Sequence, residues 1–152
     1  MATRLVKPTL EAVHAIAETM RDEDVAEIWA SHRHTPLEAM TAGFELSDLS
    51  VVVEVDDKPF AMTGLVKESL LTGRGIPWLL SSSEMLAHRR EFLLQSPPII
   101  EQMLSVCPRL SNYVHTENKL SIRWLKWLGF TIDDPRPSGL NKELFHRFHL
   151  ER

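Results

Sequence analysis

The stretch from Leu110 to Phe130, LSNYVHTENKLSIRWLKWLGF, constrains the fold more than any other part of the chain. A short apolar strand is predicted from Leu110 to Val114, and a helix follows in which apolar residues recur at helical spacing up to Leu128. Gly129 is typical of a helix end, because glycine adopts without strain the left-handed conformation that closes the last turn. Phe130 then begins a strand, FTID, so the segment predicts a strand–helix–strand unit.

The rest of the chain alternates strands and helices, with no repeat, low-complexity segment or linker. The predicted elements are a strand at 3–7, a helix capped by Thr9, helices at 24–30 and from 36 to near Gly43, a hairpin of strands 49–55 and 60–66, a buried strand at 76–82, a long helical region at 83–106 and a last strand at 144–150. Pro97 and Pro98 should kink or split the long helical region, because proline lacks the N–H that a helix interior needs.

Length and charge bound the class of protein. The 152 residues suit one domain, and the net charge of −4 argues against a protein that binds nucleic acid independently of sequence. Cys107 is the single cysteine, so no intrachain disulfide can form, and we expect it to pack in the core. No apolar run reaches the roughly 20 residues that span a bilayer, and the N-terminus lacks the apolar core of a signal peptide. These features predict a protein made and folded in a cytosol.

The order strand, Asn118, helix, Gly129-Phe130, strand resembles the C-terminal half of acetyltransferases of the GNAT fold, with the approximate pattern N-x-x-A/S…L-G-F. The resemblance implies an α/β (α+β) fold in which helices flank a mixed central sheet of six to seven strands, as one domain over residues 1–152. It also implies acetyl-coenzyme A as the cofactor, provided that the residues of the family's chemistry are present.

The first requirement of that chemistry is a glycine-rich turn whose backbone amides hold the pyrophosphate at a helix N-terminus. The corresponding segment here, Leu79 to Arg90, contains no glycine. Glu84 is predicted to lie in the first turn of the helix, where it would repel a diphosphate. If the cofactor binds at all, Ser81, Ser82, Ser83 and Asn118 are the candidate cofactor-binding residues.

The second requirement is a proton donor for the thiolate, often a tyrosine four residues before the glycine. That position is Leu125, which cannot donate a proton. Tyr113, the one tyrosine, is predicted to be a core aromatic residue. Asn118 can cap the helix without any ligand. No catalytic residue is therefore assigned from the sequence, and enzyme activity is left uncertain, with the balance toward none.

A second resemblance covers roughly Ile76 to Leu150 and is to the small internal virion proteins of short-tailed phages of the T7 type. The matched residues are Trp78, Ser81, Arg90, Asn112, Tyr113, Val114, Asn118, Ile122, Arg123, Leu125, Lys126 and Gly129. The resemblance implies a bacteriophage structural protein, associated with DNA ejection, that is located in the host cytoplasm during assembly and then in the virion. Its partners would be other virion proteins, namely portal, head or tail-core components, with neither sequence-specific nucleic acid nor a membrane span.

The main hypothesis is thus a GNAT-like virion protein without a cofactor, acting by protein–protein contacts, with Arg123, Trp124, Lys126 and Trp127 as interface candidates. Of the two tryptophans, Trp124 is expected to pack on the sheet. The alternative is an acetyl-CoA-dependent N-acetyltransferase. An early phage protein that inhibits a host enzyme and a homo-oligomer both stay open. No metal site is predicted, because the histidine pairs 32/34 and 146/149 lack neighbouring cysteine or aspartate ligands.

Overall fold

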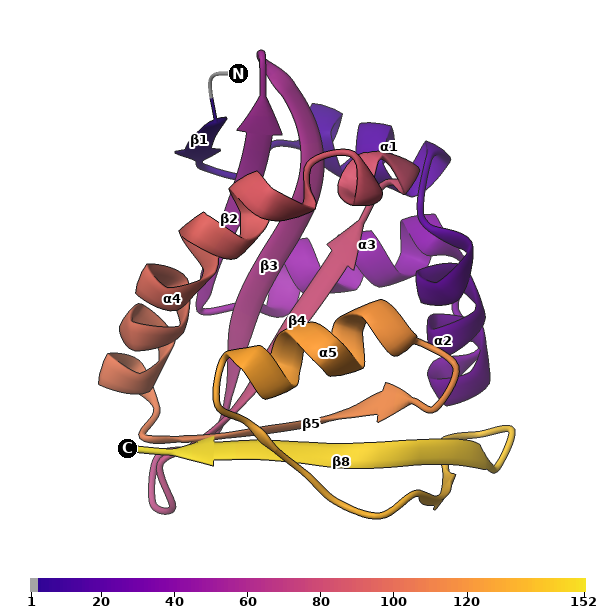
Figure 1. Cartoon of the computed structure of the whole chain (residues 1–152), viewed down its shortest axis with the longest axis vertical. Helices are drawn as coiled ribbons and strands as arrows, with labels where there is room; N and C mark the ends of the chain where they lie inside the picture. The colour runs from indigo at the N-terminus through magenta and orange to yellow at the C-terminus, as the bar shows by residue number, and fades with distance from the viewer. Residues whose placement is uncertain (1–2) are drawn as a thin grey trace.

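A mixed sheet of eight strands runs through the part of the chain that the structure describes, residues 3–152 of a computed structural model (Figure 1). In chain order the elements are β1 (Thr3–Val6), α1 (Leu10–Glu18), α2 (Asp22–His32), α3 (Pro36–Leu46), β2 (Leu49–Val55), β3 (Lys58–Ser69), β4 (Arg74–Ser81), the 3₁₀ helix η1 (Ser83–Leu86), α4 (Arg89–Val106), β5 (Arg109–His115), α5 (Lys119–Trp127), β6 (Thr131–Ile132), β7 (Arg136–Ser138) and β8 (Glu143–Glu151).

The strands follow the order β1-β2-β3-β4-β5-β8-β6, with β7 also paired to β8. All pairs are antiparallel except β4 with β5. The predicted number of six to seven strands is one too low, because β7 was missed. This strand has the sequence RPS and lies in a loop rich in proline and glycine, so it is too short and too polar for a period-two pattern.

Helices cover both faces of the sheet. In Figure 1, α4 and α5 lie in front of the strands, α1 and α3 lie behind them, and α2 stands at one side. The rear core is formed by Val13, Ile16, Met40, Val52, Met62 and Leu80, and the front core by Ile100, Met103, Leu104, Leu110, Val114, Leu125 and Phe148. Cys107 is buried in the front core, as predicted. No helix within residues 3–152 is long and apolar enough to cross a membrane.

The segment from Leu110 to Phe130 folds as predicted. β5, α5 and β6 follow one another, and Gly129 has a φ of 99° just after the helix. The N–H of Gly129 donates to Lys126 O at 3.1 Å and that of Phe130 donates to Leu125 O at 3.0 Å. These two hydrogen bonds form the motif that ends a helix with a left-handed glycine.

The long helical region departs from the prediction in two ways. Residues 83–86 form the separate short helix η1, and α4 begins only at Arg89. Helix α4 is not split at Pro97 and Pro98, since it runs without interruption to Val106. Both prolines are exposed, so their rings lie on the solvent side of the helix and do not disturb the core.

Candidate active site

The central feature of the sheet is a gap between β4 and β5. Among the described residues, these parallel strands pair only at Arg74–Arg109 and Gly75–Leu110 and diverge beyond. Strand β3 accompanies β4 as far as Ser81, and β8 accompanies β5 as far as His115. Each strand is therefore held by its outer neighbour, and the gap between them opens toward Ser81 and His115.

The edge of β4 presents backbone groups to this gap. Pro77 O accepts a hydrogen bond from Asn112 Nδ2 of β5 at 2.8 Å, and the Ser81 N–H donates to Asp24 Oδ2 at 3.0 Å. Backbone groups of alternate residues point to the same side of a strand, so the N–H and C=O of Leu79, midway between them, also face the gap. This edge can pair with an extended, amide-bearing ligand as a strand would.

A buried polar cluster lies at the wide end of the gap. Asn118, the first residue before α5, accepts a hydrogen bond from the Arg21 guanidinium on Oδ1 at 2.7 Å. Its Nδ2 lies 3.3 Å from both Asp24 Oδ1 and Glu27 Oε1. Asp24 Oδ2 also accepts from the Ser81 hydroxyl at 3.3 Å. The cluster thus connects α2, β4 and α5.

Glu27 is the titratable group of this cluster. Burial and the neighbouring Asp24 raise the pKa of Glu27 to about 7, although hydrogen bonds from His115 and Asn118 and the charge of Arg21 oppose the shift. Burial also raises the pKa of Asp24, which has the closer cation, Arg21 at 3.9 Å, and more hydrogen-bond donors. Glu27 therefore gains or loses its proton near neutral pH.

Two cavities meet at the gap. One of about 630 Å³ runs through the gap from α2 and α3 to α4 and α5 and is lined by Glu27, and another of about 420 Å³ lies between the start of α4 and α5. Leu79, Ser121 and Trp124 line both cavities. Trp124 packs on Phe92 with ring centroids 5.1 Å apart and donates from Nε1 to Ser96 Oγ at 3.0 Å. Two ligands can therefore enter, one through each cavity, and meet beside Ser121 and Leu79.

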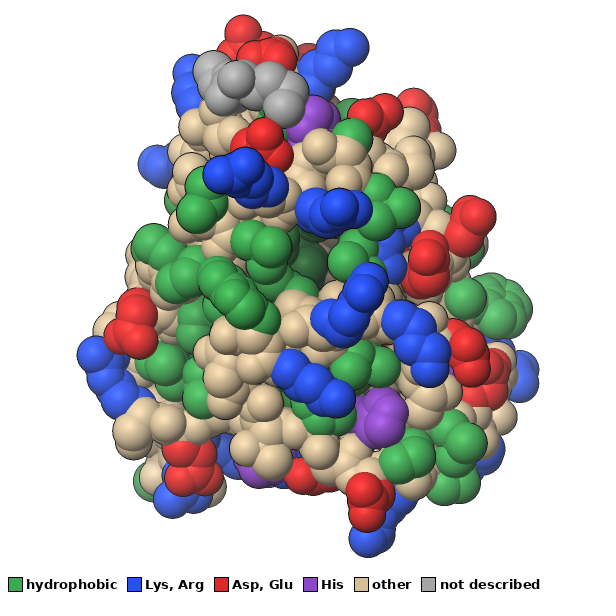
Figure 2. Space-filling model, in the orientation of Figure 1, with side chains coloured by type: hydrophobic (Ala, Val, Ile, Leu, Met, Phe, Trp, Pro, Cys, Tyr) green, Lys and Arg blue, Asp and Glu red, His purple; other side chains and the backbone are tan. Residues whose placement is uncertain are grey.

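The smaller cavity has a basic lining. Arg21, Arg89 and Arg123 border it together with apolar residues of α4 and α5. Figure 2 shows Lys and Arg side chains around a hollow lined by hydrophobic groups on this face. The first N–H groups of α4, those of Arg89 and Arg90, have no acceptor inside the helix and add positive potential there. This end of the site suits an anionic group attached to an apolar chain.

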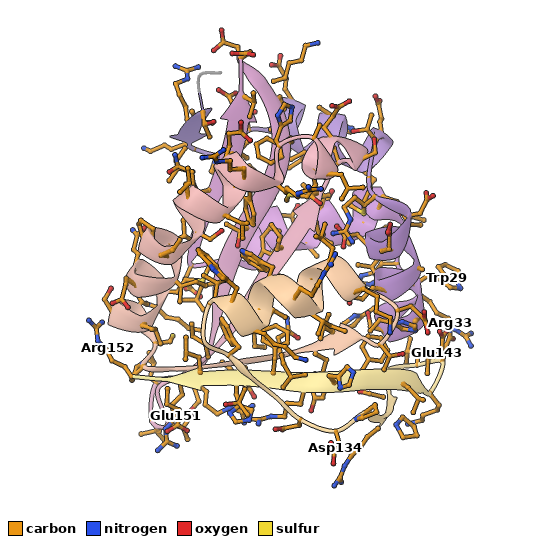
Figure 3. The ribbon with its side chains drawn as sticks, viewed as in Figure 1. Trp29, Arg33, Asp134, Glu143, Glu151 and Arg152 are labelled. Atoms are coloured by element: carbon orange, nitrogen blue, oxygen red, sulfur yellow. The ribbon has the colours of Figure 1, made fainter. Side chains whose placement is uncertain are left out.

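The loop between β7 and β8 closes one side of the larger cavity with Ser138 and Gly139. It is fixed to the end of α2, because the N–H of Leu140 donates to Ser31 O at 3.0 Å and Arg33 Nε donates to Asn141 Oδ1 at 2.8 Å. Figure 3 shows Arg33, just after α2, and Glu143 of β8 at the same end of the sheet, with Trp29 pointing outward from α2. The cavity wall is thus formed by segments far apart in the sequence.

The three serines predicted to hold a pyrophosphate have partners within the protein. Ser81 N–H donates to Asp24, Ser82 N–H donates to Phe60 O at 2.8 Å, and Ser83 N–H donates to Thr19 O at 2.7 Å. Ser82 Oγ caps η1 by accepting from the Glu84 N–H at 3.2 Å. Their backbone amides are therefore committed, and the amides nearest the smaller cavity belong to the start of α4.

Glu84 does not lie in the first turn of the long helix, contrary to the prediction. It belongs to η1, is exposed, and is not among the residues that line the smaller cavity. No glycine or proline separates residues 83–86 from α4, so the boundary at Arg89 was missed. This carboxylate therefore does not form part of the cavity wall.

The four interface candidates on α5 separate into two groups. Arg123, Trp124 and Trp127 line the smaller cavity, whereas Lys126 does not. Trp124 is partly buried against the sheet, as predicted, and Trp127 is 58% exposed. Three of the four residues therefore border the gap side of α5, where a ligand would contact them.

Two other expectations about single residues are wrong. Tyr113 is 51% exposed and lines the larger cavity instead of packing in the core, because its position on β5 faces α2 while Leu110 and Val114 face the front core. The Asn118 side chain makes no cap hydrogen bond to α5, because it is held by Arg21, Asp24 and Glu27 instead. Leu125 is buried in the core, as its apolar character requires.

Comparison with solved structures identifies the architecture. The Vibrio cholerae spermidine N-acetyltransferase in complex with CoA and spermine matches with a TM-score of 0.70 and 12% identity over 98% of this chain and 95% of that one. Ard1 from Thermoplasma volcanium gives 0.72 and 16% over 99% and 98%, and the ribosomal-protein-S18-alanine N-acetyltransferase from Escherichia coli gives 0.68 and 14% over 99% and 94%. No protein-family model and no curated protein matches the sequence.

The chain has the GNAT fold. The expectation of that fold is confirmed, and the expectation of a T7-type internal virion protein is not supported by any comparison. The interpretation of the protein as a structural phage component is contradicted, because the solved structures that share its architecture over the whole chain are N-acetyltransferases. The resemblance rested on residues such as Asn118 and Gly129 that build the GNAT fold itself.

Sequence reasoning missed Arg21, Asp24, Glu27 and Ser121. The first three lie three residues apart and so share one face of α2, which is the signal that could have found them. Ser121 occupies the A/S position of the N-x-x-A/S pattern and was treated only as part of the fold. Among residues 3–152, no group of three or more His, Cys, Asp or Glu side chains is arranged to hold a metal ion.

Proposed function

We propose that this protein is an acetyl-coenzyme A-dependent N-acetyltransferase. The observation that carries the proposal is the position of Glu27, a carboxyl group with a pKa of about 7, on the cavity that opens into the gap between β4 and β5. A general base is most effective when its pKa lies near the working pH. The shared fold with N-acetyltransferases supports the same conclusion.

The residues on the other side of the gap fit the cofactor. The smaller cavity combines Arg21, Arg89 and Arg123 with the start of α4, and these groups match the phosphates of a coenzyme A. The Leu79 N–H and C=O, which face the gap, match the amides of its pantetheine arm. Arginine side chains thus supply positive charge where the chain has no glycine-rich turn.

When bound, acetyl-coenzyme A supplies the acetyl group: the amine nitrogen forms a bond to the thioester carbonyl carbon, the C–S bond breaks, and the sulfur leaves as a thiolate. Glu27 takes the proton that the ammonium group or the attacking nitrogen must lose. Asn118 and the His115 N–H fix the orientation of this carboxylate. Asp24, which lies 3.9 Å from Arg21, keeps the pKa of Glu27 high.

The second proton transfer must return a proton to sulfur. Leu125 cannot provide it, and Ser121 is the hydroxyl residue among those lining both cavities. Its hydroxyl can donate a hydrogen bond to the thiolate, while water in the open cavity relays to the sulfur the second proton, which the nitrogen loses as the amide forms. The products are an acetamide and the free thiol.

Thermal unfolding with and without acetyl-coenzyme A tests the proposal, together with release of free thiol in the presence of a panel of primary amines. A ligand at 100 times its Kd stabilises the folded state by about 2.7 kcal/mol, which for a chain of this size raises Tm by roughly 5–10 °C. Absence of a shift at millimolar acetyl-coenzyme A, with no thiol released, would overturn the proposal.

A further inference from the structure

We propose that the acceptor is a primary amine that carries one positive charge on an apolar or aromatic body. This inference rests on the proposed acetyl transfer and specifies its substrate class. It comes from the residue types and the charges of the larger cavity, which runs through the gap and reaches α2 and α3 on the side away from the basic cavity.

The walls of the larger cavity are mainly apolar and aromatic. Ile28 of α2, Ala39, Ala42 and Leu46 of α3, Trp78 of β4 and Tyr113 of β5 all line it. Its volume of about 630 Å³ falls within the range of cavities that hold small molecules. Burial of apolar surface there favours an acceptor with an apolar body.

Trp78 forms a rigid part of this wall. A Cβ atom added at Gly43 of α3 would lie 2.7 Å from the Trp78 ring, and one added at Gly64 of β3 would lie equally close at 2.7 Å. The ring therefore fits between two glycines, and its Nε1 donates to Ser47 Oγ at 2.7 Å. A ring fixed in this way gives this part of the cavity wall a constant position beside an apolar or aromatic group.

The charges of the cavity match one ammonium group. Glu27 is the one Asp or Glu side chain among the described residues that line it, and neither Lys nor Arg is among them. A polyamine would bring further ammonium groups into apolar surroundings without carboxylate partners. A free carboxylate on the acceptor would find no Lys or Arg partner among the described residues that line the cavity. His32 and His34, whose rings lie 5.5 Å apart, also line the cavity.

Two sources share this chemistry, a free arylalkylamine and the N-terminus of a peptide that begins with an apolar residue. The assay compares 2-phenylethylamine, a peptide with N-terminal Phe, phenylalanine amide, phenylalanine and spermidine by thiol release. We expect kcat/KM to be at least tenfold higher for 2-phenylethylamine or the peptide than for spermidine, and at least tenfold higher for phenylalanine amide than for phenylalanine. Whichever of the first two is faster identifies the source.

A variant with an added carboxylate tests whether the charge of the cavity sets the number of ammonium groups on the acceptor. Ala42→Glu adds a second carboxylate to the cavity wall, and we expect it to raise kcat/KM for spermidine relative to 2-phenylethylamine at least tenfold. Ala15→Glu places the same change on the exposed face of α1, outside the cavity, and should leave the ratio unchanged. Equal ratios in both variants would contradict the proposed charge matching.

Calorimetric titration of 2-phenylethylamine and of spermidine, with and without coenzyme A, separates this inference from the proposed function. Binding of 2-phenylethylamine at least tenfold tighter than spermidine supports the inference even if no acetyl group is transferred. If acetyl-coenzyme A binds and spermidine or phenylalanine is the better acceptor, the inference is overturned while the proposed function stands.

Discussion

The carboxylate of Glu27 on α2 accepts a hydrogen bond at 2.7 Å from the backbone N–H of His115, although 88 residues separate them in the sequence. His115 is the last residue of β5, so this bond ties α2 to the strand that borders the gap. It also places one carboxylate oxygen at a fixed point beside the gap. A base positioned in this way needs little reorganisation when an amine arrives.

Glu27→Gln is expected to abolish most of the acetyl transfer without weakening cofactor binding. Glutamine keeps the shape and can accept the hydrogen bond from His115, but it cannot take a proton. General base catalysis is worth about 10²–10⁴ in rate, so kcat should fall by that factor. Thiol release measures kcat, and the Tm shift with acetyl-coenzyme A measures binding.

The matched control is Glu23→Gln, which makes the same change at an exposed position of α2. It should retain the rate of the unmodified protein. A Glu27→Gln protein that folds, binds acetyl-coenzyme A and keeps more than a tenth of kcat would show that another group acts as the base.

The pH dependence of the rate should report the pKa of Glu27. Since the base works only when ionised, kcat/KM should rise with pH through an apparent pKa of about 7 and level off above it. An initial-rate profile from pH 5.5 to 8.5 measures this limb. A profile that is flat down to pH 5.5 is the result that the assignment cannot accommodate.

The free energy of unfolding should change with pH in the opposite sense to the rate. The folded-state pKa of Glu27 lies above its ordinary value of 4.5, so the folded chain binds the extra proton between pH 4.5 and about 7. Stability is therefore highest at the acid end of this window and falls as the pH rises through it, by up to about 3 kcal/mol at 1.36 kcal/mol per pKa unit. Denaturant unfolding at pH 5 and pH 8 should show a smaller fall for Glu27→Gln.

Much of the fold followed from the sequence because its signals are local. The cap at Thr9, which accepts from Ala12 N–H at 3.1 Å, and the left-handed Gly129 depend on a few neighbouring residues. Gly43 shows the limit of such signals. It was expected near a helix end, but α3 continues to Leu46, and the glycine is needed because the Trp78 ring lies against it. No local pattern relates residues 43 and 78.

The site was harder to predict for the same reason. Glu27, Ser81, His115 and Asn118 come from α2, β4, β5 and the start of α5, and only the divergence of β4 from β5 brings them together. The absence of glycines between Leu79 and Arg90 was read correctly. The arginines that line the smaller cavity, and that supply positive charge in the proposed function, come from three separate segments and form no local pattern.

Arg123→Ala is expected to weaken coenzyme A binding, because the Arg123 side chain lines the basic cavity. Loss of one charge-assisted contact to a phosphate costs about 1.5–3 kcal/mol, which corresponds to roughly a 10- to 100-fold rise in Kd. Calorimetric titration with coenzyme A measures it. Lys126→Ala removes the same charge from an exposed position of α5 outside the cavity and should change Kd less than threefold. Equal rises in Kd for the two variants would indicate only a general electrostatic attraction between the protein and coenzyme A.

Gly43→Ala is expected to destabilise the fold although alanine is the better helix former. A Cβ at this position meets the Trp78 ring at 2.7 Å and 2.8 Å, and such overpacking costs about 1–3 kcal/mol, more than the roughly 1 kcal/mol gained from helix propensity. Phenylalanine lacks the ring atoms that clash, so Gly43→Ala should become neutral or stabilising in a Trp78→Phe background. Denaturant unfolding of the four proteins of this cycle measures the coupling. If Gly43→Ala has the same effect in both backgrounds, Trp78 is not held by Gly43, and the rigid wall of the acceptor cavity must have another origin.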